Sequence, residues 1–148
     1  MACAANEGET VRTPAIATRC NASVNHLLQV VNLLHEHGFV ETIRGRAGGL
    51  RLAESMGKIS IGRVFRVFES GTPFAECFDP ETNTCPLHQT CRLRNYIARA
   101  LDAFYNELDQ VTLEDLVKGN CGLVALLDMA PRAADCGQVR AMAQGPVA

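Results

Sequence analysis

The sequence predicts a mainly α-helical fold with one small β-hairpin, and three observations carry this prediction. Apolar residues return every three or four positions in several segments, which is the period of an amphipathic helix. One short stretch alternates instead, on both sides of a glycine-rich turn, as the strands of a hairpin do. A long, apolar-striped segment follows a loop with three cysteines. We expect a winged helix-turn-helix followed by a long C-terminal dimerisation helix.

Two short helices are predicted near the start of the chain. Thr13 precedes a proline, which fits the first position of a helix. Asn21 suits the left-handed backbone of a tight turn, and the small Ala17 suits the point where two helices cross. Ser23 then caps a second helix that ends before Gly38. Two helices joined by a three-residue turn form a helix-turn-helix.

The second helix of this pair is the predicted recognition helix, the element that enters the major groove of DNA. Its apolar side carries Val24, Leu27, Leu28, Val31 and Leu34. Its polar side offers hydroxyl, amide and imidazole groups, which can bond to base edges or phosphates. The predicted DNA contacts of this helix are Ser23, Asn25, His26 and Gln29.

A basic hairpin is predicted after the recognition helix. Residues 39–43 and 50–52 have strand-like sequences, and RGRAGG at residues 44–49 joins them. Arg44 and Arg46 lie at this tip, and an arginine on a wing can enter the minor groove, where negative potential is concentrated. We therefore add both arginines to the predicted DNA contacts.

Three further helical segments are predicted. The first, residues 59–69, is expected to bury Ile61, Val64, Phe65 and Phe68. The second spans about residues 91–110, and its apolar stripe, the predicted dimer seam, consists of Leu93, Ile97, Ala100, Leu101, Phe104, Leu108 and Val111. Thr112 caps a short final turn, and the apolar run 121–130 allows one more short helix.

These elements suggest an order of regions along the chain. Residues 1–68 form the DNA-binding domain, residues 69–91 a metal-binding loop, and residues 91–118 the dimerisation helix. Residues 119–148 are expected to be a poorly ordered tail, because they are rich in alanine and glycine. We call residues 69–91 the cysteine loop.

Charge is distributed unevenly along the chain, although its net value is only -2. Residues 12–66 hold eight basic and three acidic residues, whereas residues 67–148 hold six basic and eleven acidic ones. A basic half joined to an acidic half is typical of a nucleic-acid-binding module fused to a sensing or dimerising module. No apolar run approaches the roughly 20 residues of a membrane span, and no export signal is evident, so we expect a cytoplasmic protein that does not bind membranes.

The cysteine loop carries the candidate metal ligands Cys77, Cys85 and Cys91, spaced C-x7-C-x5-C. Three thiolates can hold three irons of a cubane iron-sulfur cluster and leave the fourth iron to another ligand. With His88, the same cysteines also match a closed Cys3His zinc site, and the spacing alone does not separate the two metals. The third interpretation is that these cysteines bind no metal and are structural. The remaining cysteines, Cys3, Cys20, Cys121 and Cys136, show no ligand-like spacing and are expected to be structural or incidental thiols.

The order of helix-turn-helix, wing, cysteine loop and long helix resembles the IscR and NsrR superfamily of iron-sulfur winged-helix regulators. The segments HLLQVVNLLHEHGFVETIRGRAGGLRLA and ECFDPETNTCPLHQTCRLRNYIARALDAFYNELDQVTLEDLV are similar to its NsrR-like members. The resemblance implies a homodimeric repressor of double-stranded DNA, not an enzyme, whose Cys77, Cys85 and Cys91 bind a cluster, 4Fe-4S rather than 2Fe-2S. Nitric oxide would nitrosylate its iron and release the DNA. His88 is then a loop residue.

The N-terminus departs from the resemblance. Family members begin with a helix of about 20 residues, and MACAANEGETVR corresponds only to its end and the following loop. The expectation is therefore a start assigned too far downstream or a truncated regulator with impaired DNA binding. A small iron-sulfur carrier is the alternative of a different class, but it leaves the basic hairpin and the polar helix face unexplained.

Overall fold

The computed structural model of the chain describes residues 1–45, 48–69, 71 and 73–129. The predicted DNA contact Arg46 lies outside these residues, as does Cys136. Among the described residues the helices are α1 (Ala2–Ala5), α2 (Thr13–Arg19), α3 (Val24–Glu36), α4 (Ile61–Glu69), α5 (Arg92–Asp109), α6 (Leu113–Val117) and α7 (Cys121–Leu127). Strands β1 (Val40–Ile43) and β2 (Gly49–Leu52) and the 3-10 turns η1 (Met56–Lys58) and η2 (Glu76–Phe78) complete the list.

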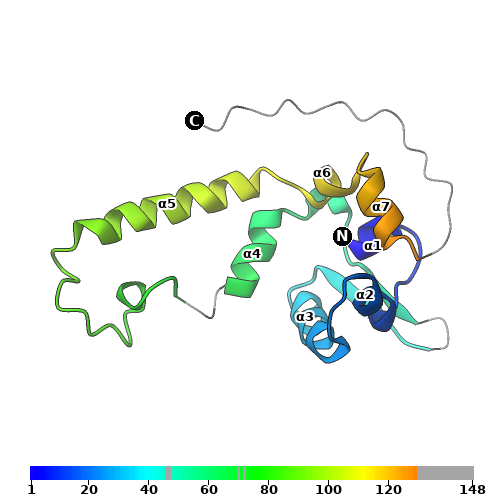
Figure 1. Ribbon diagram of the computed structural model, residues 1–148, viewed down its shortest axis with the longest axis horizontal. Helices are drawn as coiled ribbons and strands as arrows, with labels where there is room; N and C mark the ends of the chain where they lie inside the picture. Colours follow the sequence, from blue (N-terminus) through cyan, green and yellow to red (C-terminus); the bar gives the residue numbers. More distant parts are fainter. Residues whose placement is uncertain (46–47, 70, 72, 130–148) are drawn as a thin grey trace.

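These elements form a head and an arm (Figure 1). The head contains α1, α2, α3, the hairpin, α6 and α7, and the arm is α5, which extends away from the head with the cysteine loop at its far end. Helix α4 lies between them and packs against α5. The mainly α-helical fold with a single hairpin is thus confirmed.

The helix-turn-helix has the predicted turn. Asn21 adopts the left-handed conformation with φ of 49°, and the Ala22 amide donates to the Ala17 carbonyl at 2.9 Å. Ala17 is 3% exposed, so a small side chain is required where α2 and α3 approach each other. Ser23 occupies the N-cap of α3, as expected, although its side chain makes no capping hydrogen bond.

The wing is an antiparallel pair whose register joins Val40 to Leu52 and Ile43 to Gly49. Val11 extends this pair on the other side of β2, because its amide and carbonyl exchange hydrogen bonds with Leu50 at 2.9 and 2.8 Å. A Cβ on Gly49 would lie 2.8 Å from the Val11 carbonyl oxygen. Glycine at this position therefore allows the third segment to approach β2.

The hydrophobic core lies where α1, α6, η1 and the start of the hairpin meet. Its buried members are Ala4, Phe39, Ile59, Leu113 and Val117. Thr112 caps α6 in a capping box with Asp115, which confirms the predicted capped turn.

Helix α7 packs against this core and lies within the segment that the sequence predicts to be a tail. The short helix expected in its apolar run is present, and Leu127 is 5% exposed. Asn6, itself 3% exposed, donates its side-chain amide to the Leu127 carbonyl and accepts from the Met129 amide, both at 2.8 Å. This buried side chain joins α1 to the end of α7.

Helix α4 differs from the prediction in which side chains it buries. Ile61 and Val64 pack against the core, as expected, together with Val67. Phe65 and Phe68 are each 41% exposed, so the expectation that both are buried is wrong. The reason is that α4 touches the core with one face, whereas Phe65 points to Phe104 of α5, with ring centroids 6.1 Å apart.

Candidate functional site

The cysteine loop joins the end of α4 to the start of α5 (Figure 1). Cys77 lies in η2, and Cys91 is the N-cap residue of α5. Cys85 lies between them, where its amide donates to the Asn83 side chain at 3.1 Å. All three thiols are free and half-buried, a state in which a cysteine can reach a ligand and yet be shielded from bulk water.

Acidic side chains hold the loop in shape. Glu76 accepts hydrogen bonds from the amide and the hydroxyl of Thr84, both at 2.6 Å. Asp79 accepts from the Thr82 hydroxyl at 2.6 Å and from the Glu81 amide at 2.9 Å. The hydroxyl bonds are the main reason why the pKa of Glu76 and that of Asp79 lie below their ordinary values. Both carboxylates therefore have a structural role in the loop.

Arg94 fastens the loop to α5. Its Nε donates to the Cys77 carbonyl at 2.8 Å, and its guanidinium lies 5.2 Å from the centre of the Phe78 ring. The bond spans 17 residues of the chain and brings η2 to the first turn of α5. Sequence reasoning missed this residue, and the one available signal is its position three residues after Cys91.

The donors fit an iron-sulfur cluster by their chemistry, since three free thiols on one irregular loop are the ligands that such clusters use. Within the described part of the chain, however, no three histidine, cysteine, aspartate or glutamate side chains are gathered closely enough to hold a metal ion. The structure thus places the three thiols on one loop without bringing them together, and the same holds for the zinc set that includes His88.

Other cysteines lie apart from this loop. Cys3 and Cys20 are free, and burial raises the pKa of the Cys3 thiol. Cys121 is disulfide-bonded, so the expectation of a simple thiol at this position is wrong.

The recognition helix presents its predicted DNA contacts to solvent. Ser23, Asn25, His26 and Gln29 are all exposed on α3, while Val31 on its other side is buried against the head. Val24 and Leu28 remain 39% and 46% exposed, so the apolar side is covered only in part.

The wing also presents a basic side chain. Arg44 is exposed at the end of β1, and it makes no ion pair within the described residues. Arg51 of β2 instead pairs with Glu41 across the hairpin at 2.5 Å. Arg44 is thus the described arginine of the hairpin that is available to a phosphate.

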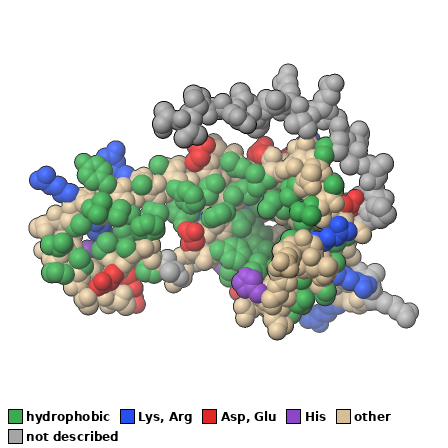
Figure 2. Space-filling view, in the orientation of Figure 1, with side chains coloured by type: hydrophobic (Ala, Val, Ile, Leu, Met, Phe, Trp, Pro, Cys, Tyr) green, Lys and Arg blue, Asp and Glu red, His purple; other side chains and the backbone are tan. Residues whose placement is uncertain are grey.

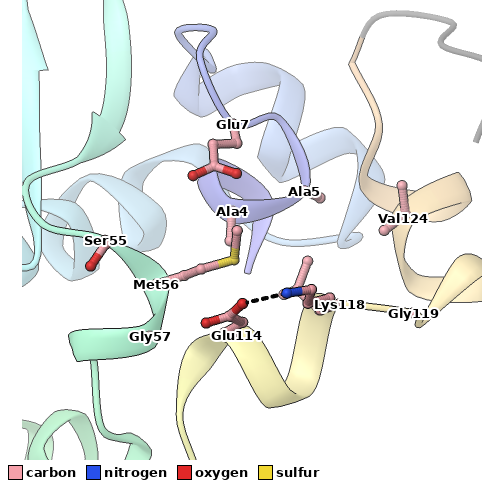
Figure 3. Close-up of a pocket in the computed structure, with 11 residues that line it drawn as sticks. Ala4, Ala5, Glu7, Ser55, Met56, Gly57, Glu114, Lys118, Gly119 and Val124 are labelled. Atoms are coloured by element: carbon pink, nitrogen blue, oxygen red, sulfur yellow. Dashed lines mark hydrogen bonds and ion pairs between the residues drawn. The ribbon is translucent and has the colours of Figure 1, made fainter. Parts of the chain in front are cut away.

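A cavity of about 500 Å³ lies between α1, η1, α6 and α7 (Figure 3). Glu114 and Lys118 pair with each other at its edge at 2.9 Å, and Met56 and Ala4 line its apolar side. None of the predicted metal or DNA ligands lines it. It therefore forms no part of the candidate site.

Comparison with known proteins gives consistent matches over most of the chain. Residues 1–119 match the model of the Rrf2 family, described as an iron-dependent transcriptional regulator. A relative from Halalkalibacterium halodurans, named HTH-type transcriptional regulator NsrR, is 44% identical over 116 residues, which are 78% of this chain and 80% of that protein.

Solved structures show the same fold. CymR, the global cysteine regulator of B. subtilis, matches with a TM-score of 0.59 at 29% identity, over 78% of this chain and 84% of that one. The T. potens IscR matches with a TM-score of 0.62 at 24% identity, over 87% of this chain and 82% of that one. Among the described residues, no helix is long and apolar enough to cross a membrane.

Proposed function

Because the chain belongs to the Rrf2 family of iron-dependent transcriptional regulators, we propose that it is a DNA-binding repressor controlled by an iron-sulfur cluster and nitric oxide. One observation carries the proposal: three free, half-buried thiols lie on the loop that connects α4 to the α5 arm. Nitric oxide as the signal and a 4Fe-4S cluster as its target are what the resemblance to NsrR-like regulators implies, and relatives named NsrR are consistent with that resemblance. The family is one of regulators and not of enzymes.

The exposed polar side of α3 supports major-groove readout. Asn25 and Gln29 carry amides that can bond to adenine, and His26 can bond to bases or phosphates. Arg44, together with the predicted contact Arg46, would reach the flanking minor groove or its phosphates. A short recognition helix reads few bases, so a symmetric pair of heads on a pseudo-palindromic site is expected.

A homodimer is proposed because much of the apolar surface of α5 is left uncovered. Helix α5 has 18 residues, none of them buried, and Leu93, Tyr96 and Phe104 are 64%, 66% and 45% exposed. A second copy that covers this surface removes apolar area from water, which stabilises the pair.

Cys77, Cys85 and Cys91 would hold the cluster, and its iron supplies the reactive centre for nitric oxide when bound. Cys91 is the N-cap residue of α5, and Arg94 binds the Cys77 carbonyl, so ligation by these cysteines would hold η2 on the first turn of that helix. When the thiols are released, the loop would keep the Arg94 bond, the bonds accepted by Glu76 and Asp79 and the bond from the Cys85 amide to Asn83.

The other end of α5 is clamped to α4, whose Ile61 and Val64 pack against the core of the head. Arg66 of α4 binds Asp109, so a shift of the arm is transmitted to α4. Coupling between two sites of a protein is typically worth about 1–3 kcal/mol, which changes affinity by about 5- to 150-fold. If the shift changes the spacing of the two DNA-binding heads, a loss of affinity in this range is sufficient for a repressor to leave its site.

Iron and labile sulfide in anaerobically purified protein test the ligand assignment. Cys77→Ser, Cys85→Ser and Cys91→Ser should each lower both contents and the visible absorption, because each removes a thiolate ligand. Cys20→Ser is the matched control, since Cys20 is free and exposed on another segment, and it should retain both. Wild-type protein that holds zinc and no sulfide would contradict the proposal.

A further inference from the structure

Two arginines, an asparagine and a tyrosine share one side of the first half of α5. Arg92, Asn95, Tyr96 and Arg99 are spaced by three and four residues, so they are neighbours on the helix surface. They line a pocket of about 260 Å³. We call these four residues the arginine face. None of them is a predicted metal ligand or DNA contact, so the proposed function leaves the arginine face without a role.

The arginine face is directed away from the apolar stripe of α5. An α-helix turns by about 100° per residue, which places the middle of the arginine face about a third of a turn from Leu93, Ile97 and Ala100. Arg94, which fastens the cysteine loop, lies on a further side of the helix. All four residues of the arginine face are exposed, and Tyr96 is 66% exposed. The pocket is therefore open to a ligand from solvent.

The charge of this half of α5 is unbalanced. From Arg92 to Leu101 the helix carries three arginines and no acidic residue. Figure 2 shows basic side chains that project from the end of the arm distant from the head. They belong to α5, because residues 70–91 contain no lysine or arginine. Charges of one sign repel each other, so an anion bound among them would be stabilising.

The two arginines of this face differ from most other described arginines, which have partners. Carboxylates or main-chain carbonyls bind Arg19, Arg51, Arg63, Arg66 and Arg94. Within the described part of the chain, Arg92 and Arg99 make no hydrogen bond, ion pair or ring contact. Both guanidinium groups are therefore available to an anion that is not part of the chain.

The chemistry of the arginine face suits the oxygens of a phosphate group. A guanidinium presents five N–H donors in a planar fork that matches phosphate geometry. Arg92 and Arg99 are two helical turns apart, about 10 Å along the axis, and their long side chains can converge on the turn between them. On that turn Asn95 and Tyr96 add an amide and a hydroxyl donor. Pockets that enclose drug-sized ligands measure about 300–1,000 Å³, so this one suits a smaller ligand.

We propose that the arginine face of α5 binds a phosphate group, either of a free phosphate compound or of a nucleic-acid backbone. This inference goes beyond the proposed function and does not depend on a cluster. Arg92 directly follows Cys91, the N-cap residue of α5, and the N-terminal end of a helix favours anions. A bound phosphate would thus stabilise the first turns of α5, to which Arg94 fastens η2.

Calorimetric titration with inorganic phosphate tests the site. Anaerobically purified wild-type protein should bind phosphate in chloride buffer at low ionic strength. Arg92→Gln and Arg99→Gln should each raise the Kd about tenfold, because each removes charge-assisted hydrogen bonds. Arg51→Gln is the matched control, since it removes the same charge from an exposed position on β2, and it should bind phosphate like wild type. If Arg51→Gln weakens binding as much, the effect is one of net charge and the assigned site is wrong.

The salt dependence of DNA binding distinguishes the two sources of phosphate. The double variant of Arg92→Gln and Arg99→Gln should reduce the magnitude of the slope of log K against log salt by about two if the arginine face contacts the nucleic-acid backbone. An unchanged slope, together with loss of inorganic phosphate binding, would identify a free phosphate compound as the ligand. If wild-type protein binds no phosphate and the double variant keeps the wild-type slope, the arginine face is an ordinary solvated surface and the proposal fails.

Discussion

Arg66 of α4 donates hydrogen bonds to both carboxylate oxygens of Asp109, the last residue of α5, at 2.5 and 2.7 Å. The two residues are 43 positions apart, and the cysteine loop lies between them in the chain. Ser60 also donates to Asp109, and Arg66 lies 4.8 Å from the centre of the Tyr105 ring. This clamp closes the segment from α4 to α5 into a unit, and the first two predictions depend on it.

The first prediction concerns the pH dependence of the clamp. The hydrogen bond from Arg66 holds the pKa of Asp109 below its ordinary value. A carboxyl whose pKa is lower in the folded than in the unfolded chain stabilises the fold above the unfolded pKa, and this contribution is lost as the pH falls through the folded pKa. Asp109→Asn should therefore lower the Tm at pH 7, and the difference from wild type should shrink as the pH falls from about 5 to about 2. A difference that is independent of pH would contradict this role.

The second prediction concerns the close approach of the two helices. Gly62 of α4 is buried, and a Cβ there would lie 2.2 Å from Asp109 Oδ1 and 2.9 Å from the Asp109 backbone nitrogen. The clash should outweigh the gain in helix propensity, so Gly62→Ala should lower the free energy of unfolding by about 1–2 kcal/mol. Gly71→Ala is the control, because a Cβ there meets no atom within 4 Å. Equal stability of the two variants in urea denaturation would exclude the tight contact.

The third prediction concerns α7. Leu127→Ala should reduce the free energy of unfolding by about 2–5 kcal/mol, because Leu127 is 5% exposed and its removal leaves a cavity. The neighbouring Leu126 is 55% exposed, and Leu126→Ala should change stability by less than about 0.5 kcal/mol. If both variants melt like wild type, α7 does not contribute to the core in solution.

The fourth prediction concerns the wing. Arg44→Ala should reduce the magnitude of the slope of log K against log salt by about one, which corresponds to the loss of one phosphate contact. The reason is that Arg44 is exposed and has no ion pair within the described chain. Arg51→Ala should leave the slope unchanged, because Arg51 is paired with Glu41. DNA fragments selected by the protein itself are a suitable probe. An unchanged slope for Arg44→Ala would remove this part of the wing from the interface.

Local patterns in the sequence were sufficient to predict most of the fold. Asn21, Ala17 and Thr112 act through their own backbone or nearest neighbours, so their roles follow from residue type and spacing. The burial of Phe65 and Phe68 was mispredicted because amphipathic spacing identifies an apolar face without showing what covers it.

Long-range contacts were beyond sequence reasoning. Asn6 binds α7 across more than 120 residues, and Arg94 binds the Cys77 carbonyl across 17. Both are single polar side chains whose partners are main-chain atoms, and main-chain atoms have no signature in the sequence. The metal ligands were predicted from the spacing of their thiols, and their assignment remains a proposal.

The most direct test of the proposed function is the affinity of anaerobically prepared protein for its selected DNA, measured by fluorescence anisotropy before and after nitric oxide. We predict that nitric oxide raises the Kd by about 5- to 150-fold, and that a variant with Cys77, Cys85 and Cys91 all changed to serine binds weakly with or without it. An identical Kd in all four measurements would contradict the account, because the cysteine loop would then have no influence on DNA binding.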